Sequence, residues 1–245
     1  MKNPSAGYLR SALFSLGFLG VLVLITPLIL LMGVLRQPYK GYWLIITWAG
    51  FCIWWLRITC NIRYQITGLE NVPDEALIVF SKHQSTWETL FLHVLTKRHQ
   101  SWVLKRELMW VPFFGWSMAA TRPIPINRGS GRKALKKIIE LGKQYLAEGS
   151  WVMIFPEGTR TSPGEKIPFA IGGAMLAAAS KYPILPVAHN AGSCWPRKGF
   201  LKYSGTIQVV IGKPIDTSEL TAKEINATTE AWMEQTMLTI ETNTN

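Results

Sequence analysis

The sequence predicts an α/β fold: a mixed, largely parallel β-sheet covered by helices and preceded by an N-terminal two-helix membrane motif. Two long uncharged stretches lie within the first 60 residues, and short β-rich runs alternate with helix-forming segments after them. Most of these runs are apolar throughout, which is typical of strands covered by helices on both faces. We expect residues 1–60 to form a membrane-embedded helical hairpin and residues 61–245 to form an α/β domain.

The composition of the chain points to a partner that is both apolar and anionic. Hydrophobic residues make up 48% of the 245 positions, charged residues only 17%, and the net charge is +11. A phospholipid bilayer fits this balance, because each Lys or Arg near anionic lipid contributes about 1 kcal/mol. No nucleic-acid partner is expected, since no basic recognition helix or aromatic-rich single-strand motif is evident. The three cysteines form no CxxC pair, which favours a reducing compartment over a disulfide framework.

The first uncharged stretch, residues 11–35, is long enough to cross a bilayer as a helix. Its 25 residues would span roughly 37 Å at about 1.5 Å per residue, against a hydrocarbon core of about 30 Å. The second stretch, residues 41–56, carries four tryptophans, which favour the membrane interface. Pro27 can kink the first stretch, so the pair predicts either two spans or a re-entrant hairpin in one leaflet. Two buried helices of a soluble core are the remaining alternative.

In either membrane arrangement the rest of the chain stays on the side of the N-terminus. We expect that side to be the cytosolic face of the bacterial inner (cytoplasmic) membrane. A cleaved signal peptide is not expected, because its apolar core would be shorter, about 7–15 residues.

The elements of the domain follow from the alternation of patterns. Helices are expected at 86–97, 132–147, 173–181 and 222–240, and Thr221 and Glu224 match a capping box at the last of them. The predicted strands are residues 63–69, 76–81, 102–105, 123–127, 151–155, 184–188 and 206–212.

Residues 83–88, HQSTWE, follow one of these apolar strands and place His83 five positions before Glu88. Five residues of regular helix turn through about 140°, so both side chains meet only if His83 lies in the loop and Glu88 in the first helical turn. Ser85 or Thr86 can cap that helix, and a carboxylate suits its positive end. Glu88 then fixes one ring nitrogen of His83 and leaves the other free as a base. A purely structural His–Glu hydrogen bond would show the same spacing.

Residues 155–161, FPEGTRT, leave another apolar strand through a proline and a glycine. Such a turn can expose backbone N–H groups beside Arg160, whose guanidinium binds phosphate oxygens in a bidentate manner. Arg128, which follows the strand at 123–127, and Lys105, which ends the strand at 102–105, are further candidate anion contacts. Taken singly, each of these charges is explained as well by an ordinary solvated surface.

Together and in this order, HQSTWE, KREL…PFFGW, INR, FPEGTR and YPILPV resemble the blocks of the glycerolipid acyltransferase family, specifically of its acylglycerol-phosphate acyltransferases. The resemblance covers roughly residues 60–215 and implies that the domain is catalytic. His83 then corresponds to the catalytic base, and Glu88 stands where the family usually has Asp. The second block lacks the glycine often found before its arginine. The resemblance makes Arg128, Glu157, Gly158 and Arg160 substrate-binding residues, and the reading of the charged and polar residues around these motifs adds Lys105 and Thr159.

The resemblance implies direct transfer of an acyl chain from acyl-CoA or acyl-acyl carrier protein to the free hydroxyl of 1-acylglycerol-3-phosphate (lysophosphatidic acid), giving phosphatidic acid in phospholipid synthesis. No metal and no cofactor besides this co-substrate is expected. Another lysolipid acceptor, such as a lyso-ornithine lipid or a lysophospholipid, and a non-catalytic lipid-binding protein are the alternatives. A covalent route through Ser85 or Cys194 lacks a GxSxG pattern. A metal hydrolase built on His83, Glu88, His93 and His99 lacks an HExxH motif or a Cys/His cluster.

Overall fold

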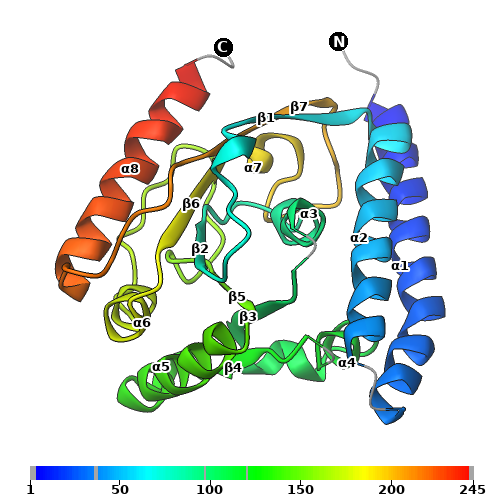
Figure 1. The fold of residues 1–245 in the computed structure, drawn as a ribbon. Coiled ribbons are helices and arrows are strands. Elements are labelled where there is room, and N and C mark those ends of the chain that lie inside the picture. The colour runs from blue at the N-terminus through cyan, green and yellow to red at the C-terminus, as the bar shows by residue number, and fades with distance from the viewer. Residues whose placement is uncertain (1–3, 36–37, 97, 120, 243–245) are drawn as a thin grey trace.

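The computed structural model describes residues 4–35, 38–96, 98–119 and 121–242, and places a seven-stranded sheet between two layers of helices (Figure 1). One layer contains α1 (Pro4–Val34), α2 (Pro38–Cys60) and α3 (Trp87–Leu95). The other contains α5 (Arg132–Ala147), α6 (Gly172–Ser180) and α8 (Ala222–Thr242). The shorter elements are α4 (Phe114–Ala119), α7 (Ala191–Cys194) and the 3-10 turns η1 (Leu69–Asn71), η2 (Arg106–Trp110) and η3 (Arg128–Ser130).

The sheet has the strand order β1-β7-β6-β2-β5-β3-β4. Its five strands from β6 to β4 are parallel, whereas β7 is antiparallel to β6 and β1 runs parallel to β7. The predicted mixed, largely parallel sheet covered by helices is therefore confirmed. The strands are β1 (Ile62–Thr67), β2 (Ile78–Ser81), β3 (Gln100–Lys105), β4 (Ile124–Ile126), β5 (Trp151–Ile154), β6 (Ile184–His189) and β7 (Gly205–Ile211).

All seven predicted strands and the four predicted helices of the domain are present, with ends within a few residues of those expected. The helix predicted at 86–97 ends at Leu95, and residue 97 lies outside the described residues. At the start of α8 the capping box forms: Thr221 N–H donates to Glu224 Oε2 at 2.8 Å, and Glu224 N–H donates to Thr221 Oγ1 at 3.3 Å. The sequence did not predict α4 and α7, because four to six residues are too few to show helical periodicity.

The apolar front end forms two antiparallel helices that lie alongside the domain (Figure 1). The segments Gly7–Val34 and Lys40–Cys60 are long and apolar enough to cross a membrane by length and composition. Within the apolar 18-residue window of each segment, 22% of the first is buried in the protein against 44% of the second, and α1 carries exposed leucines such as Leu24 (73% exposed). A helix of a soluble core would be mostly covered, so α1 does not fit that alternative. The chain passes from α2 to β1 between Cys60 and Ile62, and the division into 1–60 and 61–245 stays a prediction.

The strand order brings the two main sequence blocks together. In the parallel pair β2–β5, Phe80 lies opposite Ile154. The loops that follow these strands therefore begin side by side, although they are more than 70 residues apart in the chain. These two loops carry His83 and the FPEGTRT residues.

Candidate active site

His83 and Glu88 meet where β2 gives way to α3. His83 lies in the loop after β2, and Glu88 is the second residue of α3. Nδ1 of His83 lies 2.8 Å from Oε1 of Glu88, and the same oxygen accepts the backbone N–H groups of Gln84 (2.9 Å) and Ser85 (2.7 Å). Three donors on one carboxylate oxygen hold Glu88 as an anion, so Nδ1–H donates and Nε2 is left as the basic nitrogen.

The helix start that positions Glu88 is capped by one of the two predicted residues. Trp87 N–H donates to Ser85 Oγ at 3.1 Å, while the side chain of Thr86, at the N-cap, makes no capping bond. Thr86 instead accepts a hydrogen bond from Arg160 Nη1 at 3.2 Å. Ser85 therefore caps the helix, whereas Thr86 contacts Arg160, a residue predicted to bind phosphate.

Glu88 is fully buried, yet its pKa lies below its ordinary value. Burial alone would raise the pKa, but His189, the hydrogen bond with His83 and the backbone donor at Ser85 outweigh it. His189 Nε2 is 4.0 Å from Glu88 Oε2 and 2.8 Å from the carbonyl oxygen of Lys82. Its own pKa is lowered, first by burial. His189 Nε2–H donates to the Lys82 carbonyl and so supports the backbone leading to His83, while its ring lies near Glu88 without a hydrogen bond to it.

The FPEGTRT loop clamps His83 through its backbone. His83 N–H donates to Glu157 Oε2 at 2.8 Å, and its carbonyl oxygen accepts from Thr161 N–H at 2.8 Å and Thr161 Oγ1 at 3.1 Å. The ring of Phe155 stacks on the imidazole at 3.8 Å between centroids and 7° between planes. Both backbone polar groups and one ring face of His83 are thus fixed by a single loop.

Glu157 also forms a buried ion pair with Lys82, the residue before His83. Burial raises the pKa of Glu157 to about 7, against the opposing effects of Lys82 and the His83 N–H. Its two oxygens thus hold the Lys82 side chain and the backbone of His83, and its predicted part in substrate binding stays a prediction. Gly158 has φ +68°, a left-handed conformation that favours glycine, and its N–H closes the turn on Phe155 O at 3.0 Å.

The predicted cations are placed differently from one another. Arg160 and Lys105 are exposed and line the same cavity as His83. Thr159 is exposed but is not among the described residues that line this cavity. Arg128 begins η3, and its side chain lies outside the part of the chain that the structure describes.

The cavity in front of His83 holds about 1190 Å³ of space, part of it open to solvent, and is lined mainly by apolar side chains. Its wall on the hairpin side runs along α1 from Phe18 to Ile29, roughly 16 Å at about 1.5 Å per residue. His93 also lines it; burial, and then nearby His99, lower the pKa of His93 to about 3, so its ring is neutral. An elongated apolar space beside a base and two cations suits a lipid chain with an anionic head.

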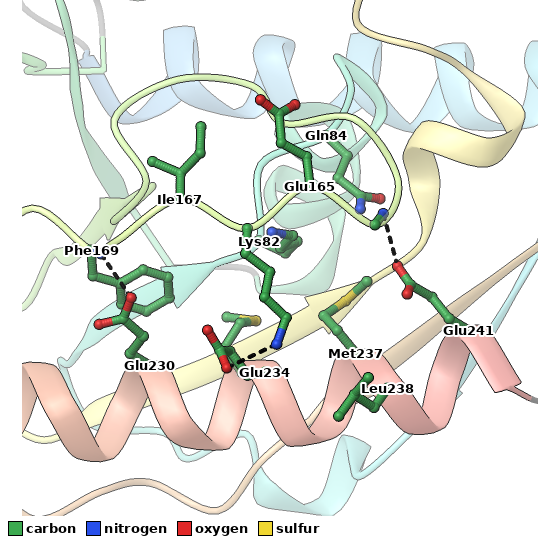
Figure 2. Close-up of a pocket in the computed structure, with 13 residues that line it drawn as sticks. Lys82, Gln84, Glu165, Ile167, Phe169, Glu230, Glu234, Met237, Leu238 and Glu241 are labelled. Carbon is green, nitrogen blue, oxygen red and sulfur yellow. Dashed lines mark hydrogen bonds and ion pairs between the residues drawn. The ribbon is translucent and has the colours of Figure 1, made fainter.

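A second, smaller pocket of about 470 Å³ lies on the other side of the loop that follows β2, between residues 164–169 and α8 (Figure 2). Lys82 and Gln84 face it, together with acidic side chains of α8 such as Glu230 and Glu234. Phe169 N–H donates to Glu230, and Lys166 pairs with Glu234 at 3.1 Å. Among the described residues, no group of three or more His, Cys, Asp or Glu is placed to hold a metal ion.

Sequence reasoning missed several residues that build this site. Lys82 and His189 gave no local signal, because their partners lie about 75 and 100 residues away in the chain. Arg197 donates to the carbonyl oxygen of Arg160 at 2.5 Å and pairs with Glu165 at 3.5 Å, so it supports the loop that carries Arg160. Only Thr161 could have been found, since it ends the FPEGTRT block.

Comparison with known proteins shows which family the chain resembles. Residues 63–190 match the model of a family described as Acyltransferase. The chain is 47% identical over 196 residues to a 1-acyl-sn-glycerol-3-phosphate acyltransferase of Pseudomonas aeruginosa, covering 79% of this chain and 76% of that protein. It is 32% identical over 170 residues to the human 1-acyl-sn-glycerol-3-phosphate acyltransferase beta, covering 68% of this chain and 61% of that protein.

The fold is similar to that of a solved structure. The crystal structure of the 1-acyl-sn-glycerophosphate acyltransferase PlsC from Thermotoga maritima matches with a TM-score of 0.78 at 21% identity, covering 95% of this chain and 97% of that one. The match therefore includes the α1–α2 pair as well as the sheet.

Proposed function

The chain belongs to the acyltransferase family, and on this basis we propose that it transfers an acyl chain from an acyl thioester to the free hydroxyl of 1-acylglycerol-3-phosphate, giving phosphatidic acid. The observation that carries the proposal is the placement of the His83–Glu88 pair on an apolar cavity that Arg160 and Lys105 also line. A base, a lipid-sized space and cations for a phosphate thus lie within one site. The names of the relatives support the same acceptor.

In the proposed reaction His83 Nε2 takes the proton of the acceptor hydroxyl as its oxygen attacks the thioester carbonyl. The C–O bond forms, the C–S bond breaks, and the leaving thiolate takes the proton back from the imidazolium. Proton transfer of this kind contributes roughly 10²–10⁴-fold to the rate. Glu88 keeps Nδ1 protonated and stabilises the imidazolium, and the stack on Phe155 fixes the ring plane.

The acceptor phosphate would be held by Arg160 and Lys105. Arg160 is fixed at its guanidinium by Thr86 and at its carbonyl by Arg197, so little freedom remains to be lost on binding. Binding the phosphate places the hydroxyl near His83 and turns binding energy into orientation. The acyl chain of one substrate would occupy the apolar cavity.

The same proposal extends to the donor and the location. The donor is acyl-CoA or acyl-acyl carrier protein, with no further cofactor. The α1–α2 hairpin holds the enzyme in the cytoplasmic membrane with the domain on the cytosolic side, where both substrates are available. The uncovered apolar surface of α1 supports this placement.

The test is thiol release from acyl-CoA by the protein purified in detergent, with an acceptor panel of lysophosphatidic acid, a lysophospholipid, a lyso-ornithine lipid and no acceptor. We expect the highest kcat/KM with lysophosphatidic acid. A higher kcat/KM with another lysolipid would identify that lysolipid as the acceptor. Thiol release at the same rate without any acceptor would exclude the transfer reaction.

Arg160→Ala sharpens the acceptor assignment. Loss of a charge-assisted contact should raise KM for lysophosphatidic acid about 10- to 100-fold with a smaller change in kcat. Lys166→Ala removes the same charge on the other side of the loop and is the matched control. Equal KM values for lysophosphatidic acid in Arg160→Ala and Lys166→Ala would contradict the assignment of Arg160 to phosphate binding.

A further inference from the structure

The segment 106–119, which comprises η2 and α4, exposes large apolar side chains that the proposed chemistry does not use. Trp110 is 75% exposed, Trp116 45% and Val111 43%. These three lie within seven residues of chain, in the KREL…PFFGW block. Clustered exposed apolar side chains on a folded protein mark a surface that binds something apolar.

The segment is rigidly built, so its outward tryptophans are held in place. Gly115 N–H donates to Val111 O at 2.8 Å, and a Cβ at Gly115 would collide with the Met109 carbonyl. Ser117 Oγ lies 2.9 Å from Thr26 Oγ1, a buried hydrogen bond that fastens α4 to α1. The apolar surface is therefore fixed relative to the hairpin.

The inner face of the same segment forms part of the cavity wall. Leu108, Phe114, Ser117 and Met118 line the cavity, while Trp110, Val111 and Trp116 lie outside its lining. Segment 106–119 thus separates the cavity from the surroundings at this end of the molecule.

The neighbouring surfaces indicate what covers this one. The α4 helix contacts α1, whose uncovered leucines continue the apolar surface, and Figure 1 shows α4 and α5 at the same end of the molecule as the C-terminal end of α1. On the other side, η2 contacts β4 and β4 contacts α5. The first turns of α5 expose Arg132, Lys133 and Lys136. Apolar residues with tryptophans, bordered by cations, fit the interface of an anionic bilayer.

We propose that segment 106–119 is a third membrane-contacting element. It lies at the headgroup level of the leaflet that receives the hairpin, with Trp110 and Trp116 inserted and the first turn of α5 on the phosphates. The outer wall of the cavity then faces lipid, so a chain drawn from the leaflet reaches His83 without crossing water. This inference rests on the proposed function for the membrane and the lipid substrate.

The first experiment measures contact with the bilayer by fluorescence quenching and does not depend on enzyme activity. An environment-sensitive fluorophore is placed at Trp110→Cys, and the matched control is Leu238→Cys, an exposed position (51%) on α8 at the opposite side of the sheet (Figure 1). The native cysteines Cys52, Cys60 and Cys194 are buried. In vesicles that contain brominated phospholipid, the label at 110 should be quenched at least about threefold more than the label at 238. Equal quenching of vesicle-bound protein at the two positions would overturn the proposal.

The second experiment uses Trp110→Ala/Trp116→Ala. With lysophosphatidic acid embedded in phosphatidylethanolamine–phosphatidylglycerol vesicles, acyl transfer should fall about tenfold or more. In detergent micelles it should stay within twofold of wild type, which shows that the variant folds and that the chemistry is intact. An unchanged rate on vesicles would overturn the third contact. Absence of transfer by wild type in micelles would instead overturn the proposed function, whatever the quenching shows.

Discussion

The two sides of the segment 82–85 face different surroundings. His83 and Ser85 face the apolar cavity between the hairpin and the sheet. Lys82 and Gln84 face the pocket against α8, whose lining carries more charged side chains (Figure 2). One tetrapeptide therefore carries the candidate chemistry on one side and its supports on the other.

The two sides of segment 82–85 differ in polarity. The cavity side, which His83 faces and which is called the front below, has few polar groups. The charge of Glu88 and the imidazole of His83 therefore lie in surroundings of low polarity, where electrostatic effects are strong. The side that faces α8, called the back below, has the Lys82–Glu157 ion pair and a hydrogen bond of 3.2 Å from Gly192 N–H to the Gln84 side chain. Buried ion pairs are weak sources of stability, and the best-supported use of this one is to fix the loop.

The largest expected effect comes from the front. His83→Ala should lower kcat/KM about 100-fold or more, because the base is lost while the cavity keeps its shape. Thiol release measures the rate, and an unchanged far-ultraviolet circular dichroism spectrum shows that the fold is intact. A rate close to wild type would remove His83 as the base and with it the distinction between the two sides.

Glu88 should rank second. Glu88→Gln keeps the length but loses the charge that stabilises the imidazolium, and kcat should fall about 10- to 100-fold. Glu88→Asp keeps the charge on a side chain shorter by one methylene, so it should keep more of the activity. If Glu88→Gln has a higher kcat than Glu88→Asp, the side chain of Glu88 only orients His83 and its charge does not contribute to the rate.

A pH effect distinguishes the back of the loop. The pKa of Glu157 is raised from its ordinary value of 4.5 to about 7, first by burial. Because this carboxyl ionises more readily in the unfolded chain, its neutral form stabilises the fold fully below about pH 4.5, and this stabilisation is lost as the pH rises through about 7. Thermal unfolding at pH 5 and pH 8 should show wild type losing stability relative to Glu157→Gln, which does not titrate. Parallel pH profiles would contradict the assignment.

The smallest effect is expected farthest from the loop, on the rim of the pocket against α8. Glu234→Gln breaks an exposed pair with Lys166, and exposed pairs contribute little. Turnover should stay within twofold of wild type and the unfolding temperature should barely move. A tenfold loss of turnover would mean that the back pocket takes part in the reaction.

The local sequence was enough to predict much of the fold and part of the site. Apolar runs marked the central strands β2, β5 and β6, because a strand covered on both faces is apolar along its whole length. The partly exposed strands β1 and β7 were also predicted, although they are not apolar throughout. The spacing of His83 and Glu88 predicted their contact, since it involves only a loop and the next helical turn. Chain-local patterns sufficed in these cases because the interacting groups are neighbours in sequence.

Local patterns in the sequence were sufficient to predict the strands, the apolar hairpin and the His83–Glu88 contact. The contacts of Glu157 with Lys82 and with the His83 N–H, and the closure of the cavity by α1 and α4, depend on how distant segments pack together. These contacts join segments that come together because β5 pairs with β2 and because α1 packs back on the domain. Periodicity records which face of a segment is buried, and it carries no information on which distant segment covers that face.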